Sequence, residues 1–239
     1  MAAELWHFAE NQFDNATKKS RKRMNILIQD HIAKLKAELD DPDIAFLYER
    51  TLPVEQEWTK RYTGWKTAKG IYKGETNRFE ALLDKLKDDK SPEWDNKIKV
   101  EVGEGTSDYI AIMPRGREPF YEGGRDERVA EVLAFAKRLE GFPALAAVKT
   151  DAEAFHTQIN DSRLLQQGKE EKADKASDAV EEQRVIVARM MYANTGRLID
   201  KFPEAPENIE RFFELQVIRE TGSDEEEVEP IPPEDEPVA

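Results

Sequence analysis

The sequence contains no cysteine, so disulfide bonds, a thiol nucleophile and a thiolate metal site are all excluded. It also lacks any apolar run near the roughly 18 residues that a transmembrane helix needs. Its first residues, MAAELWHFAENQFDN, have neither the basic start nor the apolar stretch of a signal peptide. These absences together favour a cytoplasmic protein, although a lack of cysteine alone also fits an oxidising compartment.

Basic residues are in the minority, with 36 Lys and Arg against 50 Asp and Glu, and the net charge is −14. Eight of the acids lie after residue 221, where there is no Lys or Arg, so the remaining chain carries a net charge of −6. Such a chain is not expected to bind nucleic acid or an anionic membrane over its whole surface. Residues 218–239 are acidic and proline-rich with little to bury, which predicts a disordered tail.

The chain instead has many charged residues, 36% of the total, and this content is typical of long solvated helices. Apolar residues recur at spacings of three and four, which predicts helices over about residues 3–40, 43–87, 125–141 and 144–201. Asp41 as a cap and Pro42 as a first helical residue predict where the second of these begins. FPEAPENIERFFELQVI (202–218) predicts a short closing helix whose packing edge is Phe212, Phe213 and Leu215. We therefore expect an all-α fold for residues 1–217, an elongated bundle of long antiparallel helices. Glycines in polar middle stretches leave open whether the two longest helices are continuous. An apolar seam in the last helix comprises Ala152, Phe155, Ile159, Ala173, Ala176, Val180, Val187 and Met190.

The two halves of the chain resemble each other at an offset of about one hundred residues. LKAELDDPDIAFL in the first half matches AKRLEGFPALAAV in the second, and each precedes a long helical stretch with a glycine in its polar middle. Duplication of a helical hairpin is one interpretation. Chance similarity between two helical segments is the other.

Between the halves the apolar period changes from about 3.6 to 2. KIKVEV (97–102) alternates apolar and charged residues, GEGTS follows, and DYIAIM (108–113) has isoleucines on one face. This pattern predicts one small β-hairpin inserted in the bundle, followed by an elbow that ends near residue 124.

The elbow, MPRGREPFYEGG (113–124), contains more than a turn requires. Its prolines and glycines are explained by backbone geometry alone. Arg115, Arg117, Phe120 and Tyr121 are not, and arginine and aromatic residues dominate interface hot spots. We consider these four residues candidate protein contacts. The alternative is that the aromatics anchor the loop and the arginines pair with nearby acids.

Two Glu-x-x-His pairs are candidates for metal ligands, because the i,i+3 spacing places both side chains on one helix face. They are Glu4 with His7 and Glu153 with His156. Di-iron bundle proteins use two such pairs and two further glutamates, but no spacing here identifies the other two. We expect no metal site and no cofactor.

Two further clusters have structural explanations as well as functional ones. KKSRKR (18–23) could bind phosphate or act as a nuclear address, but we favour a solvated helix face with acidic partners. Trp58, Tyr62 and Trp65 share one helical stripe, and aromatic residues at this spacing are more often core than ligand platform.

Three segments carry a family resemblance: MPRGREPFY, AFHTQ and ERFFELQVI, in this order on a helical frame. They resemble a group of uncharacterised helical proteins found in Bacteroidetes, and the resemblance covers the second half of the chain. It implies a bacterial, soluble setting, which removes the nuclear-address interpretation. It implies no activity.

The sequence as a whole favours a non-enzymatic structural or protein-interaction protein that could bind a second copy of itself. Two alternatives belong to other classes. One is a metal-binding, di-iron-like bundle enzyme, and the other is a helical protein that interacts with membranes.

Overall fold

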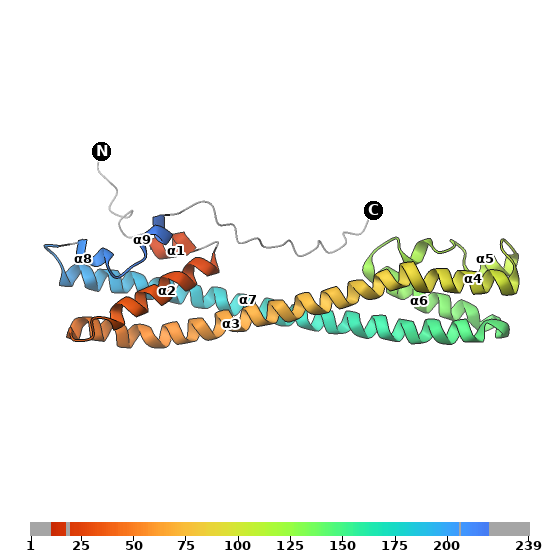
Figure 1. The fold of residues 1–239 in the computed structure, drawn as a ribbon, viewed down its shortest axis with the longest axis horizontal. Coiled ribbons are helices and arrows are strands. Elements are labelled where there is room, and N and C mark those ends of the chain that lie inside the picture. The colour runs from red at the N-terminus through yellow and green to blue at the C-terminus, as the bar shows by residue number, and fades with distance from the viewer. Residues whose placement is uncertain (1–10, 18–19, 206, 220–239) are drawn as a thin grey trace, which may run out of the picture. The chain divides into compact units, whose positions relative to one another are not determined.

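The fold, seen in a computed structural model, is built from helices (Figure 1). The structure describes residues 11–17, 20–205 and 207–219, and no β-strand occurs among them. The predicted all-α class and its long antiparallel helices are confirmed. The predicted acidic tail lies outside the described residues except for its first two positions, as do the first residues of the predicted N-terminal helix.

The predicted helix over residues 3–40 is interrupted in the structure. Helix α1 spans Gln12–Thr17 and α2 spans Arg21–Lys36. Ser20 separates them because its backbone is extended, with φ −147°, and its hydroxyl accepts a hydrogen bond from the Arg23 amide at 3.2 Å. A serine in this conformation caps a new helix rather than continuing an old one. The apolar spacing across this region did not reveal the break.

Helix α3, Pro42–Lys85, is a single helix. Its start follows the sequence signals, because Asp41 accepts a hydrogen bond from the Asp43 amide at 3.0 Å and Pro42 occupies the first helical position. The helix continues through Pro53 and through three glycines. Proline removes one internal hydrogen bond and glycine lowers helix propensity. Tertiary packing of the helix outweighs both costs.

The predicted β-hairpin is wrong. Residues 97–102 belong to helix α4, Ser91–Val102, which follows a π-helical segment at Leu86–Lys90. Residues 107–112 form helix α5, Ser107–Ile112.

The alternating apolar residues of KIKVEV do not form one buried face; only some of them lie on the buried stripe of helix α4. Trp94 and Ile98 are completely buried and Val102 is partly buried, and these three positions are four residues apart. Val100 would share the face of Ile98 in a strand, but it is 87% exposed. The helical period therefore describes the burial, and the strand period does not.

The segment GEGTS is a turn between two helices rather than between two strands. Gly103 ends α4 with φ +85°, a conformation that residues with a Cβ rarely adopt. Thr106 then caps α5, because its hydroxyl accepts a hydrogen bond from the Tyr109 amide at 3.1 Å.

The second half contains the predicted helices. Helix α6 spans Arg125–Arg138, and α7 spans Ala146–Lys201 as one helix of 56 residues. Helix α7 passes through Gly168 in its polar middle, so this stretch is helix and not a turn between two helices. Short 3-10 turns at Leu139–Gly141 and Pro143–Leu145 connect α6 to α7.

The predicted closing helix is divided in two, as α8 (Glu207–Glu210) and α9 (Leu215–Arg219). Phe212 and Phe213 lie between them and are buried, as predicted for this edge. Phe213 stacks on the imidazole of His31, with ring centroids 4.6 Å apart. The segment between the helices therefore packs through its aromatic side chains.

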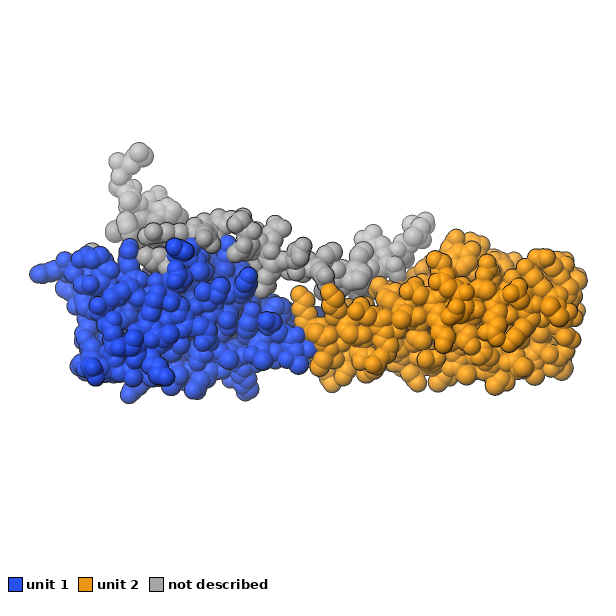
Figure 2. Space-filling view, in the orientation of Figure 1, with its two compact units in different colours: residues 1–68, 173–234 blue, residues 69–172, 235–239 orange. Residues whose placement is uncertain are grey.

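The described residues form two compact units (Figure 2), and each has its own core. In unit 1, within residues 1–68 and 173–234, α3 and α7 run antiparallel. Gln183 donates to the carbonyl of Val54 at 3.2 Å, and Arg61 donates to the carbonyl of Ala179 at 3.0 Å. The core includes Phe13, Met24, Leu27, Ile28, Leu35, Ile44, Trp58, Val180, Val187, Met191, Leu198 and Phe212.

In unit 2, residues 69–172 of the described chain, the other parts of α3 and α7 pack together with α4, α5 and α6. Tyr72 donates to Glu170 at 3.1 Å, which again places α3 and α7 antiparallel. The core includes Phe79, Leu83, Leu86, Trp94, Ile98, Phe120, Val132, Phe135, Val148, Ala152, Phe155 and Ile159. The two cores share no residue.

Candidate functional site

The segment 113–124 connects α5 to α6 in unit 2. Gly116 and Gly123 have positive φ values of 58° and 87°, so both need glycine. The Gly116 amide donates to the carbonyl of Met113 at 3.0 Å, and a 3-10 turn follows at Glu118–Phe120. The segment is therefore an ordered connection with defined turns.

Phe120 anchors this segment in the core of unit 2. Its side chain is 1% exposed, and its ring packs edge-on against Phe135 at 5.4 Å and Trp94 at 5.8 Å. The backbone at this point is also held, because Arg128 donates from Nε to the Phe120 carbonyl at 3.0 Å and from Nη2 to the Leu83 carbonyl at 2.9 Å. Of the four candidate contact residues, Phe120 is therefore part of the core.

The other three candidates, Arg115, Arg117 and Tyr121, are exposed, and we call them the Arg/Tyr surface. The Arg115 guanidinium lies 3.8 Å from Glu118, a distance typical of a weak surface ion pair. Neither Arg117 nor Tyr121 forms a side-chain hydrogen bond or ion pair with the part of the chain that the structure describes. Both side chains are thus available to a partner.

The Arg/Tyr surface also has two acidic neighbours. A hydrogen bond with Glu118 raises the pKa of Glu122, and the mutual repulsion of the two carboxylates acts in the same direction. Cations and anions are therefore mixed on this surface, which is typical of the rim of a protein interface.

The candidate metal ligands are not brought together in the described residues. Glu4 and His7 lie outside them. Glu153 accepts a hydrogen bond from Lys149 at 2.7 Å, and His156 is partly exposed on the same helix. Across residues 11–17, 20–205 and 207–219, no three His, Cys, Asp or Glu side chains are grouped so that they could hold a metal ion.

The two arginines of the basic run KKSRKR are packed into unit 1, whereas Lys22 is exposed. Lys18 and Lys19 lie outside the described residues. The Arg21 guanidinium lies over the Trp65 ring at 4.5 Å and donates to Ser177 at 2.8 Å, and Arg23 is 8% exposed. These arginines stabilise the packing of α2 instead of forming a free cationic patch. No helix in the described segments is long and apolar enough to cross a membrane.

The aromatic stripe of α3 contributes to the same unit. Trp58 is completely buried, stacks on Tyr62 at 5.5 Å and donates from Nε1 to Asn25 at 3.2 Å. Tyr62 and Trp65 pack partly buried against the core. The core interpretation of this stripe is confirmed.

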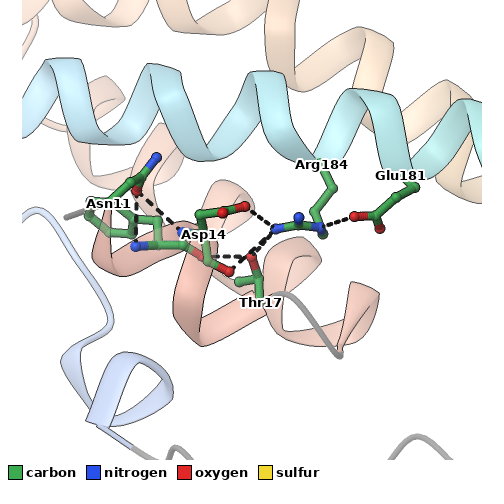
Figure 3. A network of polar contacts seen from close by, with 6 residues as sticks. Asn11, Asp14, Thr17, Glu181 and Arg184 are labelled. Carbon is green, nitrogen blue, oxygen red and sulfur yellow. Dashed lines mark hydrogen bonds and ion pairs between the residues drawn. The ribbon is translucent and has the colours of Figure 1, made fainter.

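A buried arginine of α7 holds α1 in unit 1 (Figure 3). The Arg184 side chain is 4% exposed, and its Nη1 donates to Asp14 at 2.8 Å and to Thr17 at 3.1 Å. Its Nε donates to Glu181 at 2.8 Å. Asn11 caps α1 by accepting a hydrogen bond from the Phe13 amide at 3.1 Å. All these contacts are internal, so the cluster is structural.

A second buried polar cluster joins α2, α3 and α7. His31 is fully buried, with Nδ1 2.9 Å from the Phe212 carbonyl and Nε2 2.9 Å from Asn194 Nδ2. A carbonyl only accepts and an amide NH₂ only donates, so Nδ1 carries the proton and Nε2 accepts. Asn194 also donates to Thr51 at 2.8 Å. Burial lowers the pKa of His31 to about 4, against the opposing hydrogen bond to Phe212.

A third cluster lies in unit 2. Asp151 of α7 accepts hydrogen bonds from Lys90 at 2.7 Å and from the Trp94 indole at 2.7 Å. Burial raises the pKa of Asp151, but the hydrogen bonds from Lys90 and Trp94 lower it by more, so the pKa lies below its usual value. This cluster also has only internal partners, and it fixes α4 against α7.

An apolar groove was missed at the sequence level. It lies between α3 and α7 in unit 2 and has a volume of about 470 Å³. The only signal in the sequence is Leu164-Leu165, two adjacent leucines at the edge of a polar stretch. The periodicity of α7 does not show which of the two faces the groove. The residues that line the groove are Arg78, Ala81, Leu82, Lys85, Gln158, Asp161, Ser162 and Leu165.

Comparison with known proteins adds no relative to this geometry. No family model, no curated protein and no solved structure matches the chain.

Proposed function

We propose that this chain is a non-enzymatic interaction protein that binds another protein through the Arg/Tyr surface. The observation that carries the proposal is that one short segment contains both a buried anchor and exposed side chains suited to recognition. Phe120 is buried and holds the backbone, while Arg115, Arg117 and Tyr121 stay exposed around it. A turn alone needs no exposed arginines and no exposed tyrosine.

The chemistry of these residues suits protein recognition. Arginine and tyrosine are enriched at interface hot spots, because each offers a large contact area together with hydrogen-bond donors. The anchor at Phe120 and the hydrogen bonds from Arg128 order the segment before any partner binds. Such preorganisation lowers the entropy cost of association. As part of the same proposal, we assign the protein to the cytoplasm of a bacterium.

Site-specific photo-crosslinking tests the proposal directly. A photoreactive residue at position 121 is expected to give one main crosslinked product in cells that produce the protein, with the partner peptide identified by mass spectrometry. Adding Arg117→Ala should reduce this product by about tenfold, since a hot-spot arginine commonly contributes that much to affinity. The same probe at Asp174, an exposed position of α7, is the control. Equal crosslinking from positions 121 and 174 would refute the contact.

The two other functional classes have their own tests. Elemental analysis that found about two iron or manganese ions per chain, lost in His156→Ala, would overturn the non-enzymatic proposal. Co-sedimentation with lipid vesicles at physiological salt would overturn it in favour of a membrane-interacting protein.

A further inference from the structure

The groove between α3 and α7 lies on the side of the two helices that is turned away from the core of unit 2. On α3, Phe79 and Leu83 are buried in that core, whereas Ala81 and Lys85 are exposed and line the groove. On α7, Ile159 is buried and Leu165 is 41% exposed at the groove. Each helix therefore has a second face, partly apolar, that no other helix of the described chain covers.

A buried hydroxyl at this groove has no partner. Ser162 is 8% exposed, and its Oγ forms no hydrogen bond within the described residues. Helical serines often bond to the carbonyl four residues earlier, but Ser162 does not. Buried polar groups nearly always have a partner, so Ser162 is a polar position beside the groove that α3 and α7 leave unsatisfied.

The two edges of the groove have opposite charges that are not neutralised. Lys85 lies on the α3 edge and Asp161 on the α7 edge. Neither side chain has an ion pair with the part of the chain described here. Arg78, also at the groove, differs because it pairs with Glu75 at 3.0 Å. One unpaired cation and one unpaired anion therefore lie on opposite edges of the same partly apolar groove.

We propose that a second copy of this chain docks on this groove about a two-fold axis. In such a contact, if residue i of one copy meets residue j of the other, then j of the first copy also meets i of the second. One arrangement therefore pairs Lys85 of each copy with Asp161 of the other. Leu165 of both copies lies within the contact, because it lines the groove. Two antiparallel helices from each copy form a four-helix layer, which is a standard way to cover a two-helix face. The proposal does not depend on the Arg/Tyr surface.

Sedimentation equilibrium of the full chain, with charge-reversed variants, tests the contact. Lys85→Glu and Asp161→Lys should each raise the dimer dissociation constant by at least about tenfold, because each places like charges together across the axis. Combining the two reverses both edges and should restore most of the wild-type affinity. Circular dichroism checks that each variant is folded.

Two adjacent leucines provide a matched test of the apolar strip. Leu165→Glu should dissociate the dimer, because it places a charge on the apolar part of the groove. Leu164→Glu should leave the dimer intact, because Leu164 is 58% exposed and does not line the groove. Equal effects of the two substitutions would contradict the proposed surface.

Other results would overturn the proposal outright. One is a wild-type chain that stays monomeric at high micromolar concentration. Another is a monomeric protein in which Lys85→Glu lowers the melting temperature of the full chain but not that of a chain without residues 220–239. The groove would then be occupied by the chain's own C-terminal end. A third is a dimer that the double variant Arg117→Ala, Tyr121→Ala dissociates and the charge-reversed variants do not. The self-contact would then lie at the Arg/Tyr surface. A failed crosslinking test with an intact charge-reversal effect would refute only the proposed function.

Discussion

His31 is a buried histidine that must stay neutral in the folded protein. Its Nδ1 donates to the Phe212 carbonyl and its Nε2 accepts from Asn194, so protonation would set two donors against each other. Asn194 Oδ1 has no hydrogen-bond partner among the described groups. This oxygen therefore does not accept a hydrogen bond from a ring nitrogen of His31.

The pKa of His31 predicts how stability depends on pH. Because its pKa is about 4 in the folded protein and about 6.5 when unfolded, the unfolded chain binds more protons between these values. Stability should therefore fall as the pH falls from about 6.5 to 4, by up to about 3 kcal/mol from this residue. In His31→Asn this contribution is absent, so the difference in unfolding free energy between wild type and variant should shrink towards pH 4.

Chemical denaturation at several pH values measures this difference. His156→Asn, at a partly exposed position on α7, is the control for the loss of a histidine. Parallel pH profiles for wild type and His31→Asn would contradict the assignment of a neutral buried imidazole.

Arg184 is the second residue whose burial makes a clear prediction. Replacing it with Met keeps much of the apolar stem but removes the hydrogen bonds to Asp14, Thr17 and Glu181. The two carboxylates are 40% and 44% exposed and can be hydrated, so we expect a loss of about 1–3 kcal/mol rather than the larger cost of a stranded buried charge.

The loss should appear first in α1, because a six-residue helix has little stability without its packing. Hydrogen exchange should accelerate in residues 12–17 of Arg184→Met and remain slow in the centre of α3. Arg189→Met, at an exposed position of the same helix, is the matched control. If both variants leave α1 protected, Arg184 is not what holds this helix.

At the scale of elements, two glycines have opposite roles. Gly103 ends α4 with φ +85°, and a Cβ there would meet the Thr106 methyl at 3.2 Å. Gly64 lies inside α3, and a Cβ there would meet no atom within 4 Å. The same substitution should therefore change stability in opposite directions.

Gly103→Ala should lower the free energy of unfolding by about 1 kcal/mol or more, because alanine strains the positive φ. Gly64→Ala should raise it by about 0.5–1 kcal/mol, because alanine favours the helix and restricts the unfolded chain. Thermal unfolding of both variants measures the signs. A stabilising Gly103→Ala would mean that the turn between α4 and α5 does not need this conformation.

At the scale of the whole molecule, the two separate cores predict two separately perturbed units. Leu27→Ala removes a fully buried side chain of unit 1, and Phe135→Ala removes one of unit 2. Each change should cost about 2–5 kcal/mol, from lost burial and the cavity left behind.

Native-state hydrogen exchange can show whether these losses stay local. Leu27→Ala should accelerate exchange in α2 and leave α6 protected, and Phe135→Ala should do the reverse. The comparison requires only the exchange rates of amides in α2 and α6 in each variant. Equal acceleration in both helices would show that the units open as one cooperative body.

Parts of the fold could be read from the sequence because local signals act there without competition. Asp41 followed by Pro42 starts α3 where predicted, and the apolar seam on either side of the polar middle of α7 reports its burial at most positions. The helix break at Ser20 was missed, and the alternation of residues 97–102 was wrongly interpreted as a strand. Apolar periodicity does not contain the capping hydrogen bond of Ser20 or the packing of α4 against other helices, and these contacts decide the local structure. The segment 113–124 was identified correctly as a connection that uses glycine, but the sequence could not separate the buried Phe120 from the exposed Tyr121.

The sequence by itself determined the all-α class, the apolar stripes of the long helices and the absence of thiol chemistry, because composition and the 3.6-residue period act within a few turns. Only the tertiary structure decided which side of each helix is covered. Phe120 is buried because Trp94 and Phe135 pack against it, and Tyr121, the next residue, points away from that cluster and is 41% exposed. Likewise, Leu164 and Leu165 are equivalent in sequence, and only the packing of α3 beside α7 places Leu165 at the groove. Burial depends on residues distant along the chain, and no local pattern contains that information.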